Sequence, residues 1–259
     1  MKKVRVAVIG GAGLDDDLIE GVKTRLGTRY GPSPTITIGK LSGKDIVFLP
    51  RHGEGNVLPP HKINSPANIL ALHSLGVERI IATNVVGSLN PEYKAGDIVI
   101  PKDFIDFTKS KQSTFYDDPP VTHIDVSELY CPELREIIFK AAKKRAENVW
   151  TDSVYVCTEG PRYESPAEIR MFRTLGCDII GMTGIPEAIL AHELEICYAT
   201  VCLVSNMATG LQKKVSAEEV VEKSKTHKDA VKGILKETIM NIPNKRSCYC
   251  SNALEGARV

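Results

Sequence analysis

Short apolar runs rich in Val and Ile recur along this 259-residue chain and alternate with segments of helical pattern. Such runs, without alternating polar residues, are typical of strands buried on both faces of a sheet. We expect strands at Val4–Ile9, Ile46–Leu49, Arg79–Thr83, Asp97–Ile100, Val154–Cys157, Asp178–Met182 and Tyr198–Val204. Pro near the starts and Gly after some ends predict helices at Ser65–Leu75, Pro132–Arg145, Pro166–Leu175, Pro186–Leu194 and Ala217–Ile239. The alternation predicts an α/β fold with a central mixed β-sheet flanked by helices.

No linker, charge block or internal repeat divides the sequence, so we expect a single domain over residues 1–242 and a C-terminal tail over residues 243–259. The tail loses helical periodicity, which predicts an arm or a disordered end. Residues 110–129 are polar and contain Pro119-Pro120. This segment is too long for a plain connection, which favours a functional excursion.

Composition narrows the class of partner. A content of 33 Lys and Arg against 32 Asp and Glu gives a formal net charge of +1, so no overall field favours nucleic acid or an anionic membrane. No apolar run reaches the roughly 20 residues that span a bilayer, and the first residues lack the apolar region of a signal peptide, so we expect a cytoplasmic protein. The seven cysteines lack the spacing of a zinc site, so no metal is expected. Their pattern leaves buried thiols and a structural disulfide network equally open.

Glycine-rich or polar segments follow most of the predicted strands. They are Gly10–Gly13, Arg51–Gly53, Thr83–Ser88, Glu159–Glu164, Gly181–Glu187 and Ser205–Ala208. Each alone is as well explained by a tight turn, a helix cap or a surface ion pair. Together they favour a binding site, because ligands of open α/β sheets bind outside the carboxyl ends of the strands. A dinucleotide fingerprint would need glycine where the chain has Asp16, which argues against a Rossmann oxidoreductase.

These segments, taken in order, resemble a known family. The sequences GGAGL at 10–14, RHG at 51–53, NSPAN at 64–68, GS at 87–88, EGPRYES at 159–165, GMTGIPE at 181–187 and SN at 205–206 are similar to those of trimeric purine nucleoside phosphorylases and methylthioadenosine phosphorylases. The likeness runs from about Val6 to the helix after Val215. Within the family, PPHKIN at 59–64, VTHIDVS at 121–127 and GMTGIPEAILAHEL at 181–194 resemble the branch that cleaves S-methyl-5′-thioinosine.

The resemblance implies reversible phosphorolysis, in which inorganic phosphate is a co-substrate and no cofactor is needed. It implies phosphate binding by Gly11, Ala12, Arg51, His52, Asn84 and Thr183, with Met182, Val85 and Ala208 beside the nucleoside. It implies catalytic roles for Asn206, Glu164 and His52. The chain departs from the family at Ala12, where many members carry Thr or Ser, and at Asn84-Val85, where methylthioadenosine phosphorylases carry Thr-Ala.

Two residues bear on the choice of base. Glu164 and Asn206 match the carboxylate and amide of family members specific for 6-oxopurines, whereas adenine-specific members carry Ser and Asp there. The chemistry agrees, because an ionised carboxylate only accepts hydrogen bonds and a 6-oxopurine offers an N1–H donor where adenine offers an acceptor. The resemblance therefore implies a 6-oxopurine nucleoside as substrate.

The sugar end depends on another set of positions. Ordinary purine nucleoside phosphorylases carry His at the position of Ala217, and here Ala217, Val220 and Val221 form an apolar face at helical spacing that suits a methylthio group. Such a stripe can equally face the core. His123 matches a residue that reaches the 5′ pocket from a neighbouring subunit, which implies a homotrimer or a dimer of trimers. Open alternatives are a general phosphorylase of inosine and guanosine, a methylthioadenosine phosphorylase and a non-catalytic binding module.

Overall fold

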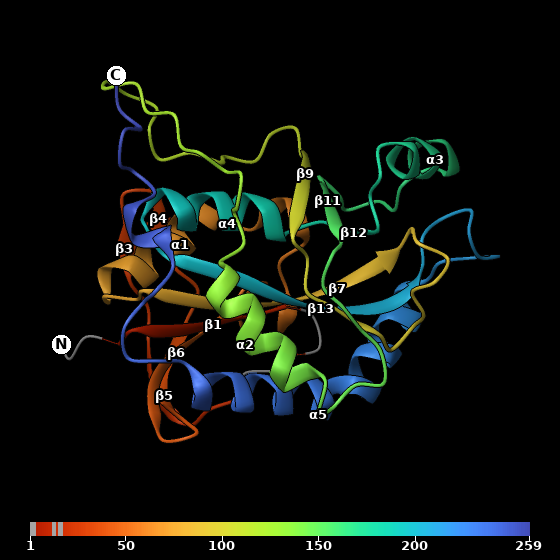
Figure 1. The fold of residues 1–259 in the computed structure, drawn as a ribbon, viewed down its shortest axis with the longest axis horizontal. Helices are drawn as coiled ribbons and strands as arrows, with labels where there is room; N and C mark the ends of the chain where they lie inside the picture. The colour runs from red at the N-terminus through yellow and green to blue at the C-terminus, as the bar shows by residue number, and fades with distance from the viewer. Residues whose placement is uncertain (1–3, 12–13, 15–17) are drawn as a thin grey trace.

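Four parallel strands form the centre of the sheet in the computed structural model, which describes residues 4–11, 14 and 18–259 (Figure 1). In spatial order they are β13 (Cys197–Met207), β7 (Arg79–Ser88), β1 (Val6–Gly10) and β6 (Lys44–Pro50). Further strands extend both edges of this centre. Beyond β6, β5 (Ile36–Leu41) pairs antiparallel with β6 and β2 (Gly21–Thr24) pairs antiparallel with β5. Beyond β13, β8 (Ile98–Val99) pairs antiparallel with β13, and β10 (Val149–Trp150) follows it. The β10 pairing with β8 is parallel. The predicted mixed sheet is confirmed.

A branch of three further strands starts at the carboxyl end of β7. There β12 (Ile179–Gly181) pairs antiparallel with β7, and β11 (Val154–Thr158) and β9 (Asp103–Phe107) continue the branch in parallel. A separate small hairpin joins β3 (Gly27–Thr28) to β4 (Gly31–Pro32). The branch therefore brings the loops after β11 and β12 to the end of the central strands.

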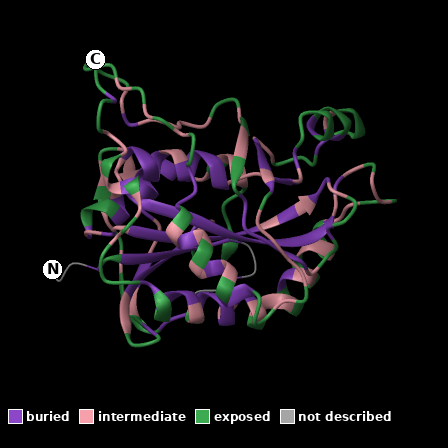
Figure 2. Cartoon of the chain, in the orientation of Figure 1, coloured by how far each residue is buried: buried purple, intermediate pink, exposed green. Residues whose placement is uncertain are grey.

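Helices cover both faces of the sheet (Figures 1 and 2). One face is covered by α1 (Ser65–Ser74) and α4 (Gly184–Glu193), the other by α2 (Pro132–Ala142) and α5 (Ala217–Asn241), while α3 (Pro166–Thr174) lies beyond the branch. Alternate residues of β1 belong to opposite cores: Ala7 and Ile9 pack on the α1 and α4 side, Val6 and Val8 on the other. Burial on both faces explains the continuous apolar run. No helix in the described part of the chain is both long and apolar enough to cross a membrane.

Two central strands are longer than expected. The segment predicted as a loop at Thr83–Ser88 lies inside β7, and Asn206 lies inside β13. The polar side chains are tolerated here because they form hydrogen bonds, Asn84 with Thr200 and Asn206 with the backbone of Met207. The pairing shifts by one residue between Val204 and Asn206, a bulge of the kind that redirects side chains near functional sites. The unpredicted strands are mostly short or exposed, so they lack the apolar run that marks the others.

The C-terminal tail packs against the chain instead of forming the expected arm or disordered end. Cys250, in a short 3₁₀ helix at Tyr249–Asn252, is fully buried. Beyond it the backbone pairs with the 110–129 excursion, since the His123 amide donates to Ala257 O over 2.8 Å and the Val259 amide donates to Val121 O over 3.1 Å. Figure 1 shows the C-terminus lying beside this excursion. Periodicity alone missed this contact because it is made by irregular backbone.

Candidate active site

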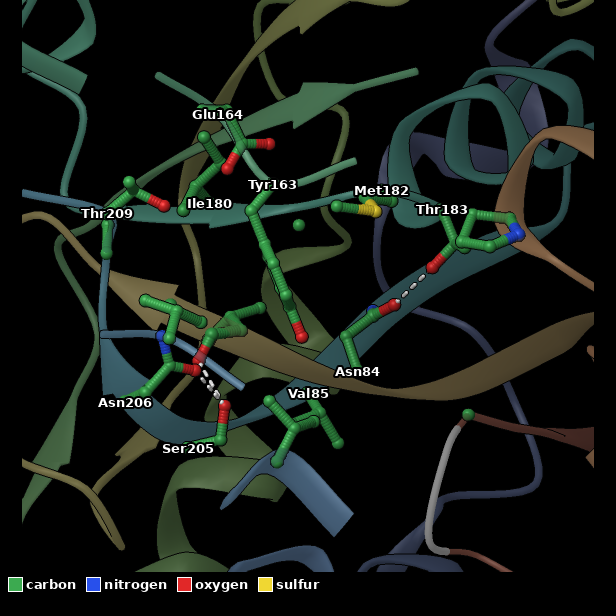
Figure 3. A pocket seen from close by; sticks show the side chains of 18 of the residues that line it. Asn84, Val85, Tyr163, Glu164, Ile180, Met182, Thr183, Ser205, Asn206 and Thr209 are labelled. Carbon is green, nitrogen blue, oxygen red and sulfur yellow. Dashed lines mark hydrogen bonds between the residues drawn. The ribbon is translucent and has the colours of Figure 1, made fainter. Parts of the chain in front are cut away.

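A cleft of about 800 Å³, open mouth included, lies at the carboxyl ends of β7 and β13. It is lined from the end of β6, from β7, β12 and β13, from the loop before α3 and from the first turn of α5 (Figure 3). Eleven of the sequence-predicted site residues line it: Gly11, Arg51, His52, Asn84, Val85, Glu164, Met182, Thr183, Asn206, Ala208 and Val220. Residues from six separate parts of the chain therefore meet in one place.

Arg51 is held by a buried ion pair. Its guanidinium donates to both carboxylate oxygens of Glu187, from Nε over 2.9 Å and from Nη2 over 2.7 Å, and Nη1 donates to Thr83 O over 2.6 Å. The side chains of Arg51 and Glu187 are 1% and 0% exposed. Burial alone would lower the pKa of Arg51, but attraction and hydrogen bonding by Glu187 outweigh it and raise that pKa. These bonds use three of the five guanidinium N–H groups, and the others remain for an anion.

Gly11 lies against this arginine because it has no side chain. A Cβ at Gly11 would overlap Thr83 O and would lie 2.9 Å from Arg51 Nη1. The Gly11 amide donates to Thr83 Oγ1 over 2.8 Å. Glycine is thus required for the close approach of the first strand's end to β7.

Thr183 and Asn84 form a linked pair at the same end of the cleft. The Thr183 hydroxyl donates to Asn84 Oδ1 over 3.0 Å, and Asn84 Nδ2 donates to Thr200 Oγ1 over 2.7 Å (Figure 3). Thr183 is the N-cap residue of α4 and its side chain does not cap the helix. The first amides of a helix carry partial positive charge and suit an anion. Thr183, Asn84 and Arg51 therefore make this end of the cleft suited to anions.

His52 keeps one ring nitrogen for a ligand. Its Nδ1 lies 2.8 Å from Leu58 O, and because a carbonyl can only accept, Nδ1 carries the proton of this bond. Burial lowers the pKa of His52, the bond to Leu58 raises it, and the charge of Arg51 lowers it again, with a net lowering. The neutral ring that results offers Nε2 as an acceptor.

Glu164 lies at the opposite end of the cleft from Thr183 (Figure 3). The residue is 7% exposed, and its Oε1 accepts a 2.6 Å hydrogen bond from Thr158 Oγ1. Burial raises the pKa of Glu164, and the bond from Thr158 opposes that rise without cancelling it. The second carboxylate oxygen remains to accept a bond from a ligand.

Asn206 is oriented by its neighbours along β13. Its Oδ1 accepts from Ser205 Oγ over 2.6 Å, and its Nδ2 donates to Met207 O over 2.8 Å. Asn206 lies directly after the shift in strand register that begins at Val204. The amide is 94% buried and still has one N–H for a ligand.

Nine lining residues were not predicted as site residues: Pro60, Val86, Gly87, Tyr163, Ile180, Gly181, Ser205, Thr209 and Val215. The Tyr163 ring lies across the middle of the cleft, between the Glu164 end and the Thr183 end (Figure 3). It is 40% exposed. The sequence signal that could have found it is an aromatic residue inside the EGPRYES motif, next to the predicted Glu164.

Three predicted residues that the structure describes do not line the cleft. His123 is exposed beside the C-terminal tail, and Ala217 and Val221 are exposed on α5, Val221 by 50%. Ala12 lies outside the described residues. Of the expected stripe of 217, 220 and 221, Val220 lines the cleft of this chain, and the buried Ser224 lies one turn further along the same face of α5.

Comparison with known proteins identifies the family of this chain. Residues 5–240 match the family described as the phosphorylase superfamily. The chain belongs to this family. It is 50% identical to the probable S-methyl-5′-thioinosine phosphorylase of Methanopyrus kandleri over 256 residues, covering 98% of this chain and 99% of that protein. It is also 50% identical to the 6-oxopurine nucleoside phosphorylase of Pyrococcus furiosus over 263 residues, covering 98% of each.

A solved structure gives the same result for the fold. The crystal structure of a methylthioadenosine phosphorylase from an antarctic soil metagenomic library superposes with a TM-score of 0.92 at 34% identity, covering 100% of this chain and 93% of that chain. The family predicted from the sequence motifs, and its fold, are thus confirmed.

Proposed function

We propose that this protein catalyses reversible phosphorolysis of 6-oxopurine nucleosides, as a pentosyltransferase of the purine nucleoside phosphorylase type. The observation that carries the proposal is that one cleft has an anion-suited end at Arg51 and Thr183 and a buried carboxylate, Glu164, at the other. Relatives that are 50% identical and named for methylthioinosine and 6-oxopurine nucleosides support the same substrate class.

Phosphate binds at the Arg51 end. The N–H groups of Arg51 that Glu187 and Thr83 leave free donate to phosphate oxygens, together with amides at the start of α4. The neutral His52 ring accepts the hydrogen of a protonated phosphate oxygen at Nε2. The Thr183 hydroxyl has one proton, so it donates to phosphate only after releasing Asn84, and otherwise accepts from a phosphate O–H.

The reaction forms a bond between a phosphate oxygen and C1′ and breaks the bond between C1′ and N9. The electron pair of the broken bond leaves with the base, which afterwards takes a proton from water. The sugar develops oxocarbenium character, so positioning of the anionic nucleophile and stabilisation of the departing base lower the barrier. The free N–H of Asn206 donates to N7 as negative charge grows there. An amide does not titrate near neutral pH, so Asn206 stabilises the base without acting as a general acid.

Glu164 selects the base. With Thr158 bonded to one oxygen, the other oxygen of the ionised carboxylate accepts from N1–H of hypoxanthine or guanine. Adenine has an acceptor at N1, so two acceptors would face each other in a buried site. Leaving the buried Glu164 unpaired costs about 1–3 kcal/mol, which corresponds to a discrimination of roughly 5-fold to 150-fold, whereas the bond from Asn206 to N7 is the same for both bases.

The finer substrate is S-methyl-5′-thioinosine, converted to hypoxanthine and S-methyl-5-thioribose 1-phosphate in purine salvage. The apolar side chains of Val215 and Val220 line the cleft and suit a methylthio group. A 5′-hydroxyl against these apolar side chains would lose hydration that they cannot replace. General phosphorolysis of inosine and guanosine is the alternative.

A nucleoside panel with and without phosphate tests the function. Free base should be released from methylthioinosine and inosine only when phosphate is present, faster from methylthioinosine, and poorly from adenosine and methylthioadenosine. Arg51→Ala should raise the KM for phosphate sharply. Binding without any turnover would reduce the protein to a binding module, and equal cleavage of methylthioadenosine and methylthioinosine would refute the role of Glu164.

The active assembly is a homotrimer or a dimer of trimers in which His123 enters the 5′ pocket of a neighbouring subunit. Its exposure away from its own cleft supports this reading. Mixed oligomers of Arg51→Ala and His123→Ala subunits should regain activity, because some clefts then combine an intact arginine with an intact partner histidine. Sedimentation that gives monomers at assay concentration would contradict the proposal. The cytoplasmic location expected from the sequence stays a prediction.

A further inference from the structure

Four cysteines from three distant parts of the chain meet at the end of the sheet away from the cleft. They are Cys131, Cys197, Cys248 and Cys250, and their four sulfurs all lie within 4.8 Å of one another. Cys131 precedes α2, Cys197 begins β13, and Cys248 and Cys250 lie in the tail. The spacing of cysteines in the sequence predicts no metal site, because only two of the four are close in sequence. The fold supplies the other two.

We propose that this cluster binds one Zn²⁺ through four thiolates. Zinc–sulfur bonds of about 2.3 Å in a tetrahedron separate the sulfurs by about 3.8 Å. The observed spacing includes 3.3 Å between the sulfurs of Cys197 and Cys248 and reaches no more than 4.8 Å for any pair. Small rotations of the four side chains therefore give a zinc site. Thiolate ligands alone in tetrahedral arrangement are the set that zinc prefers in structural sites.

The surroundings fit a closed structural site. Cys131, Cys197 and Cys250 are fully buried in the core beneath α2 and α5, and Cys248 packs against that core. Four protein ligands leave no position open for a substrate, which distinguishes such a site from a catalytic one. The remaining cysteines, Cys157, Cys177 and Cys202, are buried outside the group.

Neighbouring charges also favour bound thiolates. Zinc with four thiolates carries two net negative charges, and Cys131 stands at the positive N-terminal end of α2. Arg79 on β7 pairs in register with Cys197, so the two side chains share one face of the sheet. The Arg79 side chain is 1% exposed, and its Nε is buried without a hydrogen-bond partner. The Arg79 guanidinium is already paired with Glu133 and Glu78, and its unused Nε donor remains for a nearby anionic site.

The tail is tied to the body of the protein at the same place. Glu133 lies in the first turn of α2 and accepts two hydrogen bonds. Arg79 Nη2 donates to its Oε1 over 3.2 Å, and the Ser247 amide donates to its Oε2 over 2.8 Å. Ser247 immediately precedes Cys248. Zinc would therefore join the tail, α2 and β13 with bonds that are stronger than these hydrogen bonds. Binding displaces the thiol protons to solvent, so affinity should fall at acid pH.

The experiment measures metal and sulfur state in the full chain. Protein purified anaerobically without a reductant from cells supplied with Zn²⁺ should carry one zinc per chain after gel filtration, by elemental analysis. Co²⁺ should give the intense visible absorption of tetrahedral thiolate coordination. Cys248→Ser and Cys250→Ser should lower zinc affinity by at least roughly 100-fold, more than the loss of an outer-shell partner. Cys177→Ser, a buried cysteine outside the cluster, is the matched control and should keep full zinc.

Two results would overturn the site. One is wild-type protein without zinc whose mass is lower by four hydrogens, which means two disulfides in place of four thiolates. The other is wild-type protein whose seven cysteines are all free thiols after unfolding and that neither retains zinc nor gives the cobalt spectrum. Both measurements use the wild-type chain, so they decide the question even if the serine variants do not fold. Because the cluster is outside the cleft, phosphorolysis by folded protein should not depend on zinc, and failure of one proposal leaves the other standing.

Discussion

Replacing Glu187 by Gln isolates the buried pair that holds Arg51. The carboxylate accepts from Arg51 Nε, from Arg51 Nη2 and from the Tyr198 hydroxyl, the last over 2.7 Å, and the residue is fully buried. Glutamine keeps the volume but turns an NH₂ group toward groups that are themselves donors, and leaves the arginine charge without a counter-ion. Breaking one side of a buried ion pair costs about 3–5 kcal/mol.

The assay is urea unfolding of Glu187→Gln beside the wild type, with the phosphate KM measured on the folded variant. The expected loss corresponds to a fall in Tm of about 6–20 °C for a chain of this size. The phosphate KM should rise, because an arginine released from Glu187 no longer points its free N–H groups at a fixed place. A decrease of less than about 1 kcal/mol in the free energy of unfolding would refute the argument that Arg51 and Glu187 form a strongly interacting ion pair shielded from water.

The double variant Arg51→Met with Glu187→Leu separates stability from binding. Apolar side chains of similar volume can replace a buried ion pair at little or no cost. The double variant should therefore be more stable than Glu187→Gln. Its free energy of unfolding should stay about 1 kcal/mol below that of the wild type, because the Tyr198 hydroxyl has lost its acceptor. Phosphate-dependent turnover should not recover. An unchanged phosphate KM in this variant would remove Arg51 from the phosphate site.

Burial raises the pKa of Glu164. Acidification through that raised pKa protonates the carboxylate and removes a charge-assisted hydrogen bond to the base, so kcat/KM for 6-oxopurine nucleosides should fall roughly fivefold to tenfold. Glu164→Gln should flatten this pH profile. The folded state holds this proton at higher pH than the unfolded state, so the charge opposes folding above that pKa and Glu164→Gln should raise the urea midpoint at neutral pH. Tyr163→Ala should raise nucleoside KM roughly 5- to 100-fold by losing about 1–3 kcal/mol of stacking, whereas Tyr163→Phe keeps the ring and should change it little. Val220→Thr should reduce the preference for methylthioinosine over inosine, measured as the ratio of the two kcat/KM values, about fourfold. Val221 is exposed, so Val221→Thr is the control and should leave this ratio unchanged. A change of the ratio in the control would place the 5′ pocket elsewhere.

Much of the fold and of the site could be predicted from the sequence, because their causes are local. A strand buried on both faces needs a continuous apolar run, and Val6–Gly10 carries one whose residues alternate between two cores. Arg51, Glu164, Thr183 and Asn206 follow or end strands, and ends of neighbouring parallel strands lie together in any such sheet. Their meeting in one cleft was therefore predictable, and their roles toward phosphate and base stay predictions.

What the sequence left undecided depends on how separate elements pack. Helical spacing relates Ala217, Val220 and Val221 to one another, but the angle at which α5 docks decides that Val220 lines the cleft and the other two face solvent. The partner of Arg51 on α4 and the gathering of four cysteines from three segments were equally hidden. The sequence around a residue carries no information about which distant residue folding will bring into contact with it. Only the tertiary structure, which fixes the positions of both, decides such contacts.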